Sequence, residues 1–217
     1  MAKIEKDCPL PPHTKRDYNE CYAKVVLESL YPEQFNGLVL ADKPDLQSPS
    51  NNIGIEVTVA EKKETLEAEN LYSQLPYTDF SEKQRKIERI RQCGAKYEDG
   101  MLFTSERNSF DLVNKAVEGK IKKLQDEGYL PFREYHLFVI SSVYADDSML
   151  QDELEFLQSI RAGDSWKKIY ISVPNALYCF TFARATYEKV FIDSITQVQH
   201  GTQARQMVEE GEKDDKT

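Results

Sequence analysis

The sequence predicts an α/β fold, with a central mixed β-sheet flanked by helices. Short runs rich in β-branched and aromatic residues occupy residues 53–60, 135–142 and 168–173, and longer segments with helical composition separate them. Strands that alternate with helices favour a sheet whose faces those helices cover. The chain of 217 residues is 40% hydrophobic and 30% charged, so it can bury a core under a very polar surface.

The first half of the chain predicts a helix, a hairpin and two further helices. Asp17 is a suitable N-cap for a helix that ends near Leu30, just before Pro32. After a short apolar stretch at residues 38–41, the turn-rich residues 48–52 precede the strand at 53–60, which indicates a β-hairpin. Two helical segments follow, at residues 62–75 and 81–93, and Gly94 ends the second.

The second half contains a clearly amphipathic helix and two buried strands. A helix over residues 109–127 is predicted from its apolar stripe of Phe110, Val113, Val117, Ile121 and Leu124, and Gly128 ends it. A further helix over residues 149–160 separates the strands at 135–142 and 168–173. Residues 177–195 fit either a strand or a helix.

The domain organisation expected from composition is simple. Residues 1–16, rich in proline, are expected to be a mobile N-terminal arm, and residues 17–199 a single domain. Residues 200–217 form a charged tail that we expect to be disordered.

Several classes of protein are disfavoured by composition. No apolar run approaches the roughly 18 residues of a membrane span and no signal-peptide core is found, so a cytoplasmic protein is expected. The four cysteines are scattered, which argues against a zinc cluster or a disulfide framework. Neither a P-loop nor a GxSxG motif is present.

The formal charge of −9 argues against nonspecific coating of nucleic acid, but the charge is uneven. Between residues 82 and 96, basic residues exceed acidic ones, and this strip is a candidate DNA contact. Its candidate contacts are Lys83, Arg85, Lys86, Arg89 and Arg91. The alternative is an ordinary solvated helix face with Glu–Arg pairs.

Two carboxylates in the hairpin carry the strongest chemical signal. In the strand at 53–60, side chains alternate, so Glu56 and Thr58 project from the same face. A turn centred on the Ser50–Asn51 bond places Asp45 directly opposite Glu56. Two carboxylates so close repel each other unless a cation neutralises them, and Mg²⁺ suits such a pair. A site for Mg²⁺, with Mn²⁺ as a substitute, is therefore expected at Asp45 and Glu56.

The order of these features resembles the PD-(D/E)XK nuclease superfamily, which is restriction-endonuclease-like. The resemblance covers residues 17–142: a helix with an acidic residue, Pro44-Asp45, then Glu56-Val57-Thr58 at the end of an Ile-Gly-Ile strand, then a helix and a central strand. It implies metal-dependent phosphodiester hydrolysis with Asp45 and Glu56 on the metal. It also implies a carboxylate from the first helix, with Glu20 preferred over Glu28.

The sequence departs from the motif at Thr58, where the superfamily has a lysine. A lysine from a neighbouring helix sometimes replaces it. On the helix at 109–127, Lys120 lies beside Val113 and Leu124, whereas Lys122 points away. Lys120 is therefore the candidate for stabilising charge on the attacked phosphate, and the alternative is a lysine that extends from the helix edge into solvent.

The leading expectation is a Mg²⁺-dependent endonuclease that hydrolyses DNA, related to restriction or phage defence and able to act as a homodimer. The main alternative is a protein that keeps the nuclease fold without its chemistry and serves as a binding or protein-interaction module. A third reading is that Asp45 and Glu56 form a polar patch on an edge strand, with no site.

Overall fold

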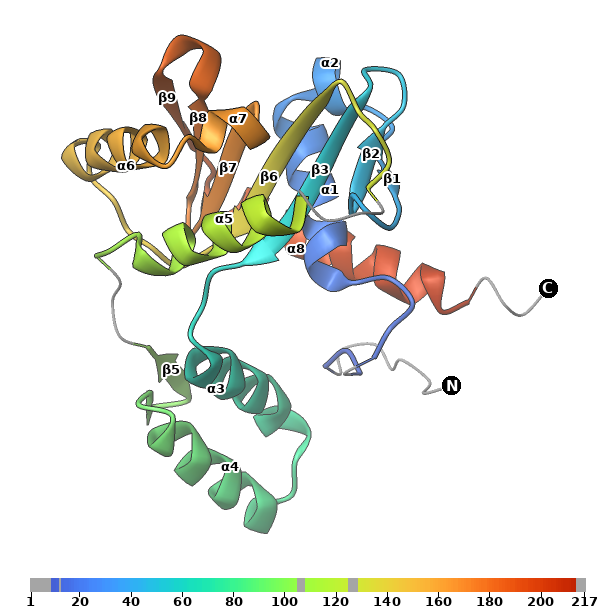
Figure 1. Cartoon of the computed structure of the whole chain (residues 1–217). Helices are drawn as coiled ribbons and strands as arrows, with labels where there is room; N and C mark the ends of the chain where they lie inside the picture. The colour runs from blue at the N-terminus through green and yellow to red at the C-terminus, as the bar shows by residue number, and fades with distance from the viewer. Residues whose placement is uncertain (1–8, 12, 105–107, 125–128, 214–217) are drawn as a thin grey trace. The chain divides into compact units, whose positions relative to one another are not determined.

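The computed structural model describes residues 9–11, 13–104, 108–124 and 129–213 (Figure 1). These residues form two compact units. The smaller unit comprises the described residues of 1–13 and 61–107, and the larger comprises those of 14–60 and 108–217. The expectation of a single domain over 17–199 differs from this division, because residues 61–107 pack among themselves.

The larger unit is built on a seven-stranded mixed sheet in the order β1-β2-β3-β6-β7-β8-β9. Its strands are β1 (Val39–Leu40), β2 (Leu46–Ser48), β3 (Ile53–Val59), β6 (Glu134–Ile140), β7 (Lys168–Val173), β8 (Ala176–Thr181) and β9 (Thr186–Phe191). β3, β6 and β7 run parallel, and the other neighbouring pairs are antiparallel. The expected α/β class, a mixed sheet flanked by helices, is confirmed.

Helices cover both faces of this sheet. They are α1 (Tyr18–Leu30), α2 (Pro32–Phe35), α5 (Asp111–Leu124), α6 (Asp147–Ser159), α7 (Ala162–Ser165) and α8 (Ser194–Gly211), with a 3-10 turn η2 at Phe182–Arg184. α5 and α6 lie on one side of the sheet, and α1 packs against α8 on the other (Figure 1). α1 begins where expected, because the Asp17 carboxylate accepts hydrogen bonds from the amides of its first turn.

The hairpin register is the one that the sequence predicts. Leu46 pairs with Ile55 and Ser48 with Ile53, so the turn is centred on the Ser50–Asn51 bond. Gly54 is needed here, because a Cβ at this position would lie 2.6 Å from the Pro44 ring. The close approach of Pro44 holds the start of β2 against β3.

The C-terminal region differs most from expectation. The ambiguous residues 177–195 form β8 and β9, and α8 continues to Gly211, so the expected disordered tail is helical to that point. Ala204 and Val208 of α8 are fully buried. The Arg16 guanidinium donates to the Met207 carbonyl at 3.0 Å, so the larger unit also begins before residue 17. The small apolar side chains among many Gln and charged residues gave α8 a weak sequence signal.

The smaller unit is a helical pair with a short hairpin. Its elements are α3 (Lys63–Gln74), the 3-10 turn η1 (Leu75–Tyr77), α4 (Phe80–Gln92), β4 (Lys96–Glu98) and β5 (Met101–Phe103). Its own small core is made of buried side chains from both helices and the turns: Ala68, Leu75, Ile87, Ile90 and Ala95. This separate core makes residues 61–107 an insertion between β3 and α5.

Candidate active site

Asp45 and Glu56 meet where the β2–β3 hairpin joins the sheet. Glu56 lies in the middle of β3 and is only 2% exposed. Asp45 immediately precedes β2, and its Oδ2 accepts a hydrogen bond of 2.7 Å from the amide of Val57. β3 is bonded to β2 on one side and to β6 on the other, so Glu56 does not lie on an edge strand.

Lys120 of α5 reaches this pair from the helix that covers the same face of the sheet. Its Nζ lies 2.5 Å from Glu56 Oε2 and 3.8 Å from Asp45 Oδ2. The Lys120 side chain is only 15% exposed, so it does not extend into solvent. The helical wheel therefore placed this ammonium group correctly, although nothing in the local sequence of β3 points to it.

Of the two candidate carboxylates on α1, Glu20 belongs to the cluster and Glu28 does not. The pKa of Glu20 is raised to about 7, chiefly by burial and then by the charges of Asp45, Asp17 and Glu56, while Lys120 opposes them. Glu28 instead accepts hydrogen bonds from the amides of Gly37 and Leu38, at 3.0 and 2.9 Å. Glu28 thus anchors the turn before β1.

The remaining electrostatics fit an acidic, partly dehydrated site. Burial raises the pKa of Asp45, and the hydrogen bond from the Val57 amide opposes that effect. Sequence reasoning missed Tyr129, whose pKa is raised by burial and then by the Glu56 carboxylate beside it. Tyr129 lies outside any periodic element, so the sequence carried no signal for it.

The residues fit a divalent cation held by few protein ligands. Glu56 Oε1 is buried and has no hydrogen-bond partner among the described residues, so its lone pairs are available inside the site. The described part of the chain holds no group of three or more His, Cys, Asp or Glu side chains arranged around one ion. A two-carboxylate arrangement is the kind that Mg²⁺ uses when water and phosphate complete its shell.

No family model matches the chain, and neither the curated proteins nor the solved structures include a match. Within the described residues, no helix has the length and apolar character needed to cross a membrane.

The basic strip lies on α4 of the smaller unit, and much of it is paired internally. Arg89 makes two hydrogen bonds to Glu67, at 2.6 and 2.8 Å. Lys86 pairs with Glu82 at 3.3 Å, and Arg91 with Glu88 at 3.5 Å. These contacts agree with the alternative of a solvated face with ion pairs. Lys83 and Arg85 are the members of the strip left for an external anion among the described residues.

Proposed function

We propose that this protein is a Mg²⁺-dependent nuclease that hydrolyses DNA phosphodiester bonds. The observation that carries the proposal is the convergence of Lys120 on the two carboxylates predicted from the hairpin, 2.5 Å from Glu56 and 3.8 Å from Asp45. In this arrangement the two carboxylates would bind the metal ion, and the amine next to them would supply a positive group for the phosphate.

The order of elements supports a restriction-endonuclease-like fold of the PD-(D/E)XK type. α1 precedes the β1-β2-β3 meander, and α5 then leads to β6, which pairs parallel to β3. The larger unit keeps this order although residues 61–107 are inserted between β3 and α5. The insertion contributes none of the four candidate residues Glu20, Asp45, Glu56 and Lys120.

Each side chain has a distinct task in this proposal. Asp45 and Glu56 would hold Mg²⁺, which supplies Lewis-acid stabilisation and activation of water when bound. Lys120 would stabilise the negative charge that develops on the attacked phosphate. Glu20, with a pKa near 7, can hold or release a proton at neutral pH and so suits general acid–base work.

A cleavage assay with matched variants tests the proposal. Linear and supercoiled DNA should be cut with Mg²⁺ or Mn²⁺ and spared with EDTA. Glu56→Gln and Lys120→Met should lose activity by at least about a hundredfold, whereas Glu118→Gln and Lys122→Met, at exposed positions of α5, should not. DNA left intact with either metal at high protein concentration would remove this function.

One observation favours a second candidate, an inactive nuclease-fold binding module. Lys120 already neutralises Glu56 directly, in a chain whose net charge is −9. Calorimetric titration with Mg²⁺ separates the two candidates. If neither Mg²⁺ nor Mn²⁺ binds, and Asp45→Asn changes nothing, the Lys120–Glu56 pair is structural and the binding module is the better description.

A further inference from the structure

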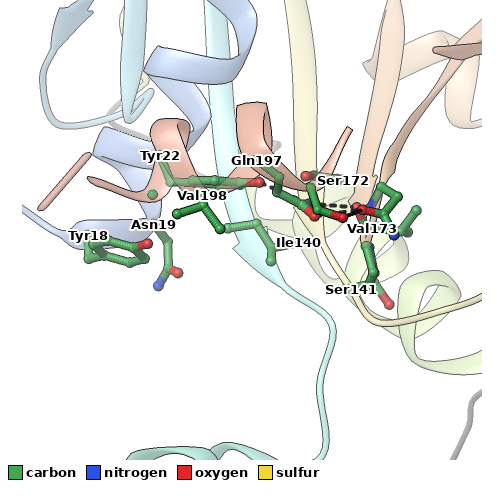
Figure 2. A pocket seen from close by; sticks show the side chains of 13 residues that line it. Tyr18, Asn19, Tyr22, Ile140, Ser141, Ser172, Val173, Gln197 and Val198 are labelled. Carbon is green, nitrogen blue, oxygen red and sulfur yellow. Dashed lines mark hydrogen bonds between the residues drawn. The ribbon is translucent and has the colours of Figure 1, made fainter. Parts of the chain in front are cut away.

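A pocket of about 610 Å³ lies at the carboxyl ends of β6 and β7. It is lined by Ile140, the last residue of β6, by Ser141, which follows it, and by Ser172 and Val173 at the end of β7. The first turns of α1 and α8 supply the other walls, with Tyr18, Asn19 and Tyr22 on one helix and Gln197 and Val198 on the other (Figure 2). The carboxyl ends of parallel strands are the usual place for ligands in α/β sheets.

The pocket is neutral in a highly charged protein. None of the 13 residues that line it carries a charged side chain, whereas 30% of the chain is charged. Two tyrosine rings, Tyr18 and Tyr22, lie nearly parallel with centroids 6.4 Å apart, and Tyr18 is 37% exposed. A neutral, flat, aromatic group would gain stacking contact here, while a phosphate would find no cation.

Two polar side chains in the pocket keep their hydrogen-bonding capacity. The Gln197 carboxamide is already engaged, donating to the Val173 carbonyl at 2.9 Å and accepting from the Asn175 amide at 3.0 Å. In contrast, the Asn19 carboxamide and the Ser172 hydroxyl make no hydrogen bond within the described residues. A carboxamide offers a donor and an acceptor together, which is the combination that reads the edge of a base.

The pocket is connected to the candidate active site through α1, on which Asn19 directly precedes Glu20. Ile140 pairs with Val59, three residues beyond Glu56 on β3, which corresponds to about 10 Å of strand. Because side chains alternate along a strand, Val59 and Ile140 lie on the opposite face of the sheet from Glu56 and Lys120. A nucleic-acid strand that reaches both sites would therefore pass around the carboxyl end of β3.

We propose that this pocket binds one unpaired nucleobase of the nucleic-acid substrate, stacked on Tyr18 and hydrogen-bonded by Asn19 and Ser172. The inference rests on the proposed nuclease function, because the base in the pocket would belong to the same strand as the phosphate that reaches Lys120. Stacking on an aromatic side chain supplies affinity for any base, and the free polar groups supply a preference among bases.

Binding of free nucleosides tests the pocket without any cleavage. The probes are adenosine, guanosine, cytidine and thymidine, titrated in EDTA into the intact Glu56→Gln protein and followed by NMR, with ribose 5-phosphate as the control that lacks a base. At least one nucleoside should bind with a dissociation constant of about 1 mM or tighter, and ribose 5-phosphate should not. Tyr18→Ala should weaken binding by about fivefold or more, as expected for a lost stacking partner.

A blocking variant and its matched control locate the binding. Val198 lines the pocket and is 69% exposed, so Val198→Trp should fill the mouth without disturbing the core and should weaken nucleoside binding by about tenfold. Ile195, also on α8 and 72% exposed, does not line the pocket, and Ile195→Trp should leave binding unchanged. The absence of binding by all four nucleosides, or equal binding by both tryptophan variants, would overturn the proposal.

Oligonucleotides distinguish a base of the substrate from a free nucleoside. A single-stranded oligonucleotide should bind the Glu56→Gln protein more tightly than the same oligonucleotide with one abasic residue near its centre, and Val198→Trp should abolish the difference. Nucleoside binding with no abasic effect would overturn the assignment to the substrate strand. None of these binding measurements requires hydrolysis. A protein that does not cleave DNA could therefore still bind nucleosides in the pocket, and failure of the base-binding proposal is distinguishable from failure of the proposed nuclease activity.

Discussion

Replacement of Lys120 by Met tests whether the ammonium and the two carboxylates form one electrostatic unit. The methionine keeps most of the volume of the side chain and removes its charge. Glu56, whose side chain is 3% exposed, would lose the cation that lies 2.5 Å from it. Loss of one partner of a buried pair costs about 3–5 kcal/mol, because the other charge stays buried without compensation.

The lower part of that range applies here, because the Lys120 side chain is 15% exposed and Asp45 is 21% exposed. A loss of about 3 kcal/mol corresponds to a decrease in Tm of about 6–12 °C for a chain of this size. The fluorescence of Trp166 reports the unfolding of the larger unit, because it is the single tryptophan and is fully buried in that core. Unfolding in urea with EDTA present gives the free energy directly.

A double-mutant cycle identifies the cause of the loss. In the Glu56→Gln background, Lys120→Met should cost about 1 kcal/mol or less, because the charge of Glu56 is absent and the remaining carboxylate, Asp45, is 3.8 Å away and 21% exposed. Added Mg²⁺ should restore stability to Lys120→Met but not to the double variant. A cost for Lys120→Met that is equal in both backgrounds, or below about 1 kcal/mol in the wild type, would refute the electrostatic account.

Three further predictions follow from packing and titration. Gly54→Ala should destabilise the protein by about 1–3 kcal/mol and weaken Mg²⁺ binding in calorimetry, because the added Cβ would displace Pro44. The control Gly119→Ala, where a Cβ would meet open space, should have neither effect. The pKa of Glu20 is raised from its usual 4.5 to about 7, so the folded state retains a proton that the unfolded state has lost, and stability falls as pH rises through that window. In the wild type, the free energy of unfolding should fall by about 1 kcal/mol between pH 5 and pH 8, after allowing for solvent screening. Glu20→Gln should remove this fall, and a pH dependence of urea unfolding that is unchanged in the variant would contradict the prediction. Deletion of residues 200–217 should abolish cooperative unfolding of the larger unit by circular dichroism, because α8 is buried against α1; a truncated protein as stable as the full chain would contradict this.

The sequence alone determined the features that depend on local geometry. The register of Asp45 against Glu56 followed from the alternation of side chains and the composition of the turn, both of which act within about ten residues. The inward direction of Lys120 followed from the helical stripe of α5. These local rules were sufficient to propose the acidic and basic parts of the site.

Only the tertiary structure decided the features that depend on contacts between distant segments. Glu20 and Glu28 flank the same apolar stripe of α1, so the sequence does not distinguish them. In the structure the Glu28 carboxylate accepts a hydrogen bond from the amide of Gly37, in the turn before β1. α8 has a weak helical pattern in the sequence, and its helical structure is stabilised mainly by packing against α1. The neutral pocket could not be read from the sequence, because its walls come from four elements whose residues are far apart along the chain.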